Sequence, residues 1–390
     1  CCAISSRCAA SRVAIIMIRE QVCLMKMAFR WFGAHDDNIS LEQIGQIPGC
    51  TGIFGSLPQY APGEVWPEND IRALVQTVHD AGLSIEVIES VNVHEDIKMG
   101  LPSRDRYIDA YIQTIRNLAR CGIKVIVYNF MPVFDWLRTD LARPLPDHST
   151  VMYYDDAMLQ NVSPEQIVEQ TSAKSNGFSL PGWEPERLAE LRQVLVRYES
   201  IDEDKLLENY RYFLNTVIPV CEQAGVRMAV HPDDPAWPVF GIPRIAHTQE
   251  QLERILQLYD SPANSLCFCT GSFGSSPQND VPAALRHFGE RQRIACVHVR
   301  NIKFLGHKKF QEAAHLSACG SLDLYEIMKV LCDVGFDGWL RPDHGRMIWG
   351  ERARPGYGLY DRALGLTYLS GLWEAICKSH HCFYLETSVN

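Results

Sequence analysis

The sequence predicts an α/β fold of the (β/α)8 TIM barrel class, with a long insertion after the fourth strand. Three observations indicate this class: eight apolar, β-branched runs, helix-period segments between most of them, and residues of metal-ligand type at the ends of the last four runs. Alternating strands and helices are typical of parallel strands joined by right-handed crossovers. An open, doubly wound sheet is the alternative, but it divides its strands around a switch point and brings those four ends together less readily.

The predicted strands and helices follow one another along most of the chain. The strand-like runs are 27–33, 50–57, 84–90, 124–130, 227–233, 265–272, 294–301 and 338–345. The helix-period segments are 68–83, 104–123, 248–260 and 321–336. Gly82 and Gly122 close the first two, as is typical of a helix C-terminus. Thr248 and Ser321 begin the last two, each with an acidic or amide residue in the first turn, so we expect both side chains to cap their helices.

The connection between the fourth and fifth runs is too long for a simple crossover. About a hundred residues separate Phe130 from Arg227, starting with a Pro- and aromatic-rich stretch and becoming helical from about Glu184 to Gly225. Insertions of this kind often lie over a barrel mouth and shape its pocket, so we expect a cap on the same domain. The expected organisation is an N-terminal extension at 1–24, one catalytic barrel at 25–375 with its insertion at about 131–226, and a C-terminal tail at 376–390.

The composition is typical of a globular protein and argues against a nucleic-acid-binding, membrane-spanning or disulfide-rich one. The 46% hydrophobic content and 22% charged content describe a globular chain with a large core. A net charge of −10 argues against a nucleic-acid partner, which would select a basic surface. No apolar stretch approaches the roughly 18 residues of a membrane helix. The 14 cysteines are scattered through helix and strand patterns, unlike a disulfide scaffold, so a reducing cytoplasm is the expected compartment.

Four residues that can bind metal follow the last four strand-like runs: His231, Cys269, His298 and Asp343. A single His or Cys after an apolar run is more often a core or loop residue. Residues that leave the carboxyl ends of barrel strands face one mouth, however, so four in corresponding positions predict one metal site. Cys267 is the alternative thiolate, which would point the same way in an alternating strand, but Cys269 lies nearer the mouth.

The predicted ligand set limits the identity of the metal. Two imidazoles, a carboxylate and a thiolate suit Fe(II), Mn(II), Co(II) or Zn(II) better than Mg(II). A closed structural zinc site is the alternative, but such sites usually use paired cysteines at short spacing.

Three further residues near the last strand are candidates for catalysis. His344 follows Asp343 and cannot point the same way on an extended strand, so it is a candidate acid or base beside the metal. Tyr357 lies in a Gly- and Pro-rich loop from which a phenol could reach the mouth, with Tyr360 as the alternative. Hydrogen bonding to a ligand and simple packing are the structural alternatives for His344 and Tyr357. Arg341 could pair bidentately with a carboxylate at the mouth.

Other residues are candidates for lining a pocket at the mouth because they end strands, begin the insertion or follow the seventh strand. They are Arg30, Trp31, Asn129, Trp136, Arg138, His307 and His315. Each has a structural alternative in packing or a salt bridge. His307 and His315 fit a mobile lid and a direct substrate contact equally well.

Several long motifs occur in an unusual combination: MKMAFRWFG, YNFMPVFDWLRTDL, VHPDDP, FCTGSFG, HVRNIK and LRPDHGR followed by RPGYGLYDRALG. From about Met25 to Trp373 the chain closely resembles the mannonate dehydratase family of the bacterial hexuronate pathway. The resemblance implies a hydro-lyase built on a barrel related to the xylose isomerase-like enzymes, which converts D-mannonate to 2-keto-3-deoxy-D-gluconate. It further implies Mn(II) or Fe(II), with His344 and Tyr357 as the proton-handling pair. Barrels of this class often self-associate, so a homodimer is also expected.

The candidate residues match the demands of that reaction. Dehydration of a sugar acid requires loss of a weakly acidic proton beside a carboxylate and expulsion of hydroxide from the next carbon. Positive charge assists the first step, and an acid or Lewis acid assists the second. A sugar isomerase or epimerase of the same superfamily is one alternative, although it would typically use more carboxylate ligands. A non-catalytic metal- or carbohydrate-binding barrel is the other, and it would not need His344 or Tyr357.

Overall fold

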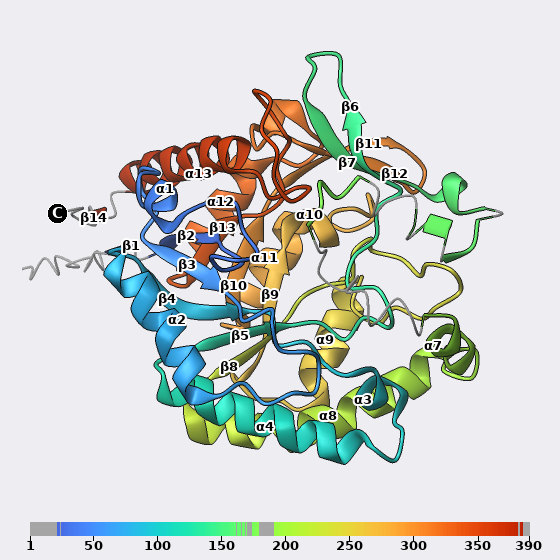
Figure 1. The fold of residues 1–390 in the computed structure, drawn as a ribbon. Coiled ribbons are helices and arrows are strands. Elements are labelled where there is room, and N and C mark those ends of the chain that lie inside the picture. The colour runs from blue at the N-terminus through green and yellow to red at the C-terminus, as the bar shows by residue number, and fades with distance from the viewer. Residues whose placement is uncertain are drawn as a thin grey trace, which may run out of the picture.

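The centre of the protein is a closed barrel of eight parallel strands (Figure 1). The computed structural model describes residues 22–23, 25–160, 191–380 and 383–384, and parts of 162–178. The barrel strands are β2 (Lys26–Arg30), β3 (Gly52–Gly55), β4 (Ser84–Glu89), β5 (Val125–Tyr128), β8 (Arg227–Val230), β9 (Asn264–Cys269), β10 (Ile294–Val299) and β13 (Trp339–Pro342). They are neighbours in chain order, and β13 pairs with β2 to close the ring. The predicted barrel is confirmed, and each strand-like run overlaps one barrel strand.

Helices surround the barrel (Figure 1). Those described are α1 (Leu41–Gly45), α2 (Glu68–Asp80), α3 (Glu95–Met99), α4 (Arg104–Arg120), α7 (Leu191–Tyr198), α8 (Glu203–Ala224), α9 (Gln249–Leu258), α10 (Thr270–Phe273), α11 (Val281–Gly289), α12 (Leu324–Asp333) and α13 (Leu359–Ser379), with 3-10 turns η1 (Asp156–Leu159) and η2 (Ser317–Cys319). The predicted helices correspond to α2, α4, α9 and α12. No helix among the described residues is long and apolar enough to span a bilayer.

One of the two predicted helix caps is confirmed. The Thr248 side chain accepts a hydrogen bond from the Gln251 backbone N–H at the start of α9. The prediction for Ser321 is wrong, because Asp323 caps α12 and accepts from the N–H groups of Tyr325 and Glu326. Asp323 directly precedes the first helical residue, so its carboxylate reaches the free N–H groups of the first turn, whereas Ser321 lies too far upstream.

The insertion contributes to a second sheet, which the sequence analysis did not anticipate. Strands β6 (Asp140–Pro144) and β7 (Thr150–Asp155) form an antiparallel hairpin. Strand β7 pairs with β12 (Lys309–Ala313), which pairs with β11 (Asn301–Gly306) directly after β10. The insertion is thereby joined to the segment that follows the seventh barrel strand.

The helical part of the insertion contains α7 and α8, and α8 ends at Gly225 in the left-handed conformation. The beginning of the predicted helical part, at 184–190, lies outside the described residues, as do residues 1–21 of the predicted extension. A short parallel pair, β1 (Val22–Cys23) with β14 (Phe383–Tyr384), joins the two ends of the described chain.

Apolar side chains fill the interior of the barrel. This interior cluster consists of Ala28, Phe54, Val87, Val125, Val127, Ala229, Cys267, Ala295, Cys296 and Trp339. A larger apolar cluster includes residues of the surrounding helices. At the carboxyl ends of the strands, buried polar residues such as Arg30, Glu89 and Arg341 occur instead. Functional sites of parallel barrels lie at this end.

Candidate metal centre and active site

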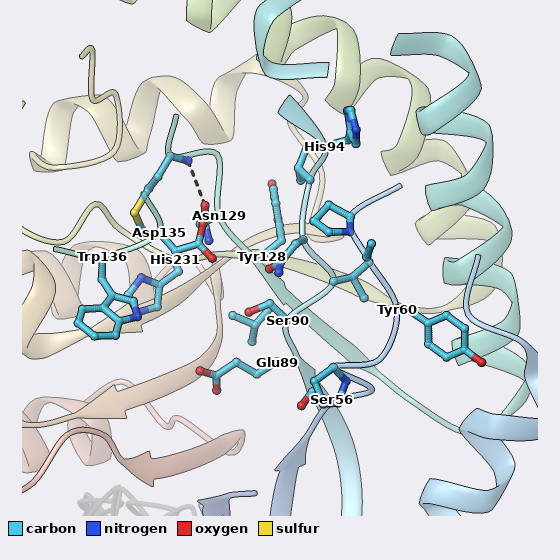
Figure 2. Close-up of a pocket in the computed structure, with 18 of the residues that line it drawn as sticks. Ser56, Tyr60, Glu89, Ser90, His94, Tyr128, Asn129, Asp135, Trp136 and His231 are labelled. Atoms are coloured by element: carbon cyan, nitrogen blue, oxygen red, sulfur yellow. Dashed lines mark hydrogen bonds between the residues drawn. The ribbon is translucent and has the colours of Figure 1, made fainter. Parts of the chain in front are cut away.

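A cavity of about 750 Å³ opens among the carboxyl ends of the barrel strands (Figure 2). Its wall includes Glu89 at the end of β4, His231 after β8, and Arg341 and Asp343 at β13. In Figure 2, His231 and Trp136 lie toward one end and Tyr60 toward the other. Residues from strands far apart in sequence therefore face a single cavity, as expected for a barrel mouth.

The four predicted metal ligands converge at one side of this cavity. Candidate ligand atoms of His231, Cys269 and His298 lie within 4.8 Å of one another. The Sγ of Cys269 is 3.4 Å from Oδ2 of Asp343. Nδ1 of His231 lies 2.8 Å from the Pro232 carbonyl oxygen, to which it can donate, and this leaves Nε2 for a metal. The arrangement brings two imidazoles, a thiol and a carboxylate together, and this donor set fits a transition-metal ion.

The alternative thiol, Cys267, lies deeper in the barrel. Its Sγ is 3.2 Å from Nε2 of His298, and it packs within the interior cluster. Cys269 is instead grouped with His231 and contacts Asp343, both of which line the cavity.

Arg341 links the ligands to a carboxylate that the sequence analysis missed. Its guanidinium donates to both oxygens of Glu89, at 2.9 and 2.7 Å, and to Oδ1 of Asp343 at 2.9 Å. Its Nη2 is also 3.2 Å from Nδ1 of His298. The expectation that its fork binds a substrate carboxylate does not match this geometry, because Glu89 occupies the fork. Arg341 instead orients Asp343 and His298.

The same contacts keep both carboxylates ionised. Burial raises the pKa of Glu89, but Arg341, His298 and Arg30 together outweigh it and hold that pKa well below the usual range. Burial likewise raises the pKa of Asp343, and His344, Arg341 and Arg300 together lower it well below its usual value. A metal ligand must be deprotonated, so this environment suits Asp343 to that role.

The predicted pair His344 and Tyr357 is in contact. Nε2 of His344 lies 3.0 Å from the Tyr357 hydroxyl. On the other side of the ring, Nδ1 contacts Nη1 of Arg300 and lies 3.4 Å from Oε1 of Glu312. Both ring nitrogens therefore have partners, which fixes the orientation of the imidazole at the cavity wall.

A network of four fully buried or nearly fully buried charges supports His344, which we call the charge network: Arg138, Asp234, Arg300 and Glu312. Arg300 donates to Glu312 and to Asp234, both at 2.7 Å. Arg138 donates to the same two carboxylates, both at 2.8 Å. The two cations balance the two anions, which is how charges are retained in an interior.

Two members of the network had a local signal in the sequence. Arg300 lies two residues after His298, and Asp234 lies three residues after His231. Glu312 had none, since it lies on β12 of the unanticipated sheet. Glu89 also ends a predicted strand and could have been found by the rule that selected the metal ligands.

Removal of one charge from the network is expected to destabilise the fold. Glu312→Gln would leave Asp234 as the one carboxylate that Arg138 and Arg300 share, and lower the free energy of unfolding by about 3 kcal/mol. Denaturant unfolding measures this change. Glu208→Gln removes an exposed carboxylate that pairs with Lys205 and is the matched control, expected to leave stability unchanged. Equal stability of both variants would contradict a structural role for the network.

Of the residues predicted to line a sugar pocket, three reach the cavity wall: Arg30, Asn129 and Trp136. Four do not: Trp31, Arg138, His307 and His315. Arg30 and Trp31 are adjacent at a strand end and point differently, so the Trp31 indole donates to the Ile39 carbonyl at 3.0 Å. Arg138 is held in the charge network.

The two histidines after the seventh strand are also away from the cavity wall. His307 is exposed in the turn between β11 and β12. His315 is buried, with Nε2 3.1 Å from the Val299 carbonyl oxygen. Burial beneath α13, where Gly365 leaves space for the ring, explains why His315 cannot act as a mobile lid or a direct contact.

Comparisons with known proteins agree with this site. The family model described as D-mannonate dehydratase (UxuA) matches residues 25–382. A mannonate dehydratase of Lachnoclostridium phytofermentans is 64% identical over 91% of this chain and 99% of its own length, and one of Thermotoga neapolitana is 57% identical over 91% and 98%. The crystal structure of the Streptococcus suis mannonate dehydratase superposes with a TM-score of 0.85 at 43% identity, covering 94% of this chain and 99% of that one.

A xylose isomerase domain protein of Planctomyces limnophilus shares only the fold, with a TM-score of 0.53 at 13% identity over 90% of this chain and 98% of that one. Because the family match covers every strand of the barrel, the chain belongs to the D-mannonate dehydratase family.

Proposed function

We propose that this protein removes water from D-mannonate to give 2-keto-3-deoxy-D-gluconate in hexuronate catabolism. The observation that carries the proposal is the convergence of four metal-ligand types beside the His344–Tyr357 pair, in a chain of this family. The ligands are His231, Cys269, His298 and Asp343, and the ion is Mn(II) or Fe(II). Their mixed donors favour a transition metal over Mg(II).

The metal has a limited and specific task in this reaction. When bound, it supplies positive charge that stabilises the negative charge developing on the substrate's oxygens. The remaining steps fall to the protein's own side chains.

The proton transfers fall to His344 and Tyr357. The reaction removes the proton at C2 and expels the C3 hydroxyl, which leaves as water once protonated. The resulting enol then loses the proton of its C2 hydroxyl and gains one at C3, which gives the keto acid. The 3.0 Å contact between Nε2 of His344 and the Tyr357 hydroxyl allows a proton to pass between them. Burial, with the nearby charge of Asp343, raises the pKa of Tyr357, so its phenol is protonated at neutral pH and can donate. The Trp136 ring, 6.0 Å from that of His344, helps to exclude water.

Arg30 is positioned to attract the carboxylate of the substrate. It lines the cavity, and its guanidinium donates to the Ser56 hydroxyl at 3.0 Å. Burial lowers the pKa of Arg30 to about 10, which still leaves it cationic at neutral pH. Asn129 and Trp136, on the same cavity wall, are proposed to contact the sugar chain.

The cellular setting follows from the chemistry of the cysteines. Cys267, Cys269 and Cys296 are free thiols, and a thiolate ligand with a readily oxidised metal requires reducing conditions. A cytoplasmic location fits these requirements. Assembly as a homodimer remains an expectation, which sedimentation of the purified protein would test.

The function is tested by restoring metal to metal-stripped protein. Without oxygen, the stripped protein should form no 2-keto-3-deoxy acid from D-mannonate, and added Mn(II) or Fe(II) should restore product formation. Mg(II) is the control ion and should restore little activity. A folded protein that forms no product with any of these ions would overturn the proposal.

Gly271 provides a test of how closely His344 must be positioned. A Cβ at Gly271 would overlap the side chain of Arg300, which in turn contacts His344. Gly271→Ala should therefore displace Arg300 and lower kcat about a hundredfold, since a shift of about 1 Å can have that effect. Gly371→Ala is the matched control, because a Cβ there meets nothing within 4 Å. Equal kcat values for the two variants would show that Arg300 does not position His344.

A further inference from the structure

A second group of potential metal ligands lies inside the barrel, next to the proposed centre. It consists of Cys267, Cys296 and His298, whose ligand atoms lie within 4.8 Å of one another. Cys267 and Cys296 are direct partners in the parallel pairing of β9 with β10. All three side chains are completely buried. We call this group the inner thiol site.

We propose that the inner thiol site binds a thiophilic divalent ion, Zn(II) or Cd(II), and that this binding inhibits the enzyme by withdrawing His298 from the catalytic metal. The inhibitory part rests on the proposed function, because it needs His298 as a ligand of the catalytic ion.

The donors of the inner thiol site select a soft ion. Two sulfurs and one imidazole favour Zn(II) and its heavier congener Cd(II) over Mn(II). Binding releases one proton from each thiol to solvent, so the ion must form bonds strong enough to compensate for this loss. A divalent ion with two thiolates and a neutral imidazole carries no net charge, which suits the apolar surroundings of Ala229 and Ala295 in the interior cluster.

His298 cannot serve both sites at once. Its Nε2 is 3.2 Å from the Sγ of Cys267. Its Nδ1 is 3.2 Å from Nη2 of Arg341, whose positive charge repels a metal cation from that side. One nitrogen is therefore available, and the inner thiol site competes for it with the group that contains His231 and Cys269.

The cavity offers a route to the inner thiol site. Glu89 lines the cavity, and its Oε2 lies 3.2 Å from the same Nε2 of His298. A cation attracted to this carboxylate is thus already next to the imidazole. The inner thiol site lies one side chain beyond the cavity wall.

The test compares wild-type protein with Cys296→Ser, using Cd(II) as the probe. Cysteine thiolates bound to Cd(II) give an ultraviolet charge-transfer absorption that grows with the number of bound sulfurs. At one equivalent of Cd(II), Cys296→Ser should absorb less than wild type. Cys221→Ser, which alters a buried cysteine of α8 outside the site, should absorb like wild type. Both variants keep every other cysteine, so the difference reports Cys296 alone.

The second readout is inhibition of Mn(II)-dependent activity. The Cd(II) concentration that halves activity should rise about tenfold or more in Cys296→Ser. Even loss of a residue that only hydrogen-bonds to a metal ligand lowers metal affinity by that factor. Unchanged activity of Cys296→Ser with Mn(II) alone verifies that it folds, and Cys296→Ala repeats the test should the hydroxyl disturb the interior. Equal absorption and equal inhibition in wild type and variant would overturn the proposal. The absorption can be measured without catalysis. If the protein were inactive with D-mannonate but wild type still absorbed more than Cys296→Ser, the proposed function would be refuted and metal binding at the inner thiol site would stand.

Discussion

Replacement of Cys269 by serine is expected to weaken Mn(II) binding by about a hundredfold or more and to abolish dehydration of D-mannonate. The substitution exchanges a thiolate for a neutral hydroxyl, which removes both charge and a soft donor from the proposed centre. Loss of a residue that only hydrogen-bonds to a metal ligand lowers metal affinity by about 10- to 100-fold, so loss of a direct ligand should exceed that range. Electron paramagnetic resonance of free Mn(II) measures the affinity, and formation of the keto acid measures activity.

The cysteine control identifies which thiol binds the catalytic ion. Cys221→Ser makes the same chemical change in α8 and should leave both readouts intact. Cys267→Ser is the decisive comparison, because its sulfur lies 3.2 Å from the shared ligand His298. If Cys267→Ser lost Mn(II) while Cys269→Ser retained it, the assignment of the ligand would be reversed.

Replacement of His344 by asparagine is expected to lower kcat by about a hundred- to ten-thousandfold, the usual contribution of a positioned acid or base. Asparagine is polar but does not exchange a proton at neutral pH, and the Tyr357 hydroxyl would lose its partner at 3.0 Å. Mn(II) affinity should be unchanged, because His344 lies outside the proposed ligand set. Steady-state kinetics at saturating Mn(II) and direct metal titration measure the two effects separately.

A matched control for this variant is His79→Ala, which alters an exposed histidine of α2. It should leave kcat, KM and Mn(II) affinity unchanged. If His344→Asn instead lost Mn(II) binding as severely as Cys269→Ser, His344 would be a metal ligand and its assigned role in proton transfer would be wrong.

Local patterns in the sequence were sufficient to predict the barrel and the positions of its proposed ligands. Parallel barrel strands are buried on both faces and read as apolar runs, and their carboxyl ends share one mouth. Each proposed ligand lies at the carboxyl end of an apolar, strand-like run, and this position alone was enough to select them without knowledge of any contact: His231, Cys269, His298 and Asp343. The same rule could have located Glu89, had carboxylates at every strand end been considered.

The contacts that depend on side-chain direction and on distant pairing could not be predicted in this way. Glu312 meets Arg138 of the insertion, 174 residues earlier in the chain, where β12 pairs with β7. The Arg341 fork was assigned to a substrate, because its partner Glu89 lies across the barrel, far away in sequence. Such pairs are fixed by the closed barrel and have no local signature.

The proposed dehydration is tested most directly by proton NMR of the reaction run in D2O with Mn(II)-loaded protein. We expect D-mannonate to lose its C2 proton and the keto acid product to carry one solvent deuterium at C3, because the protein removes the first proton and returns another. The His344→Asn variant should form this product at a greatly reduced rate. Exchange at C2 that returns mannonate or an epimer, with no loss of water, would contradict dehydration and indicate an epimerase.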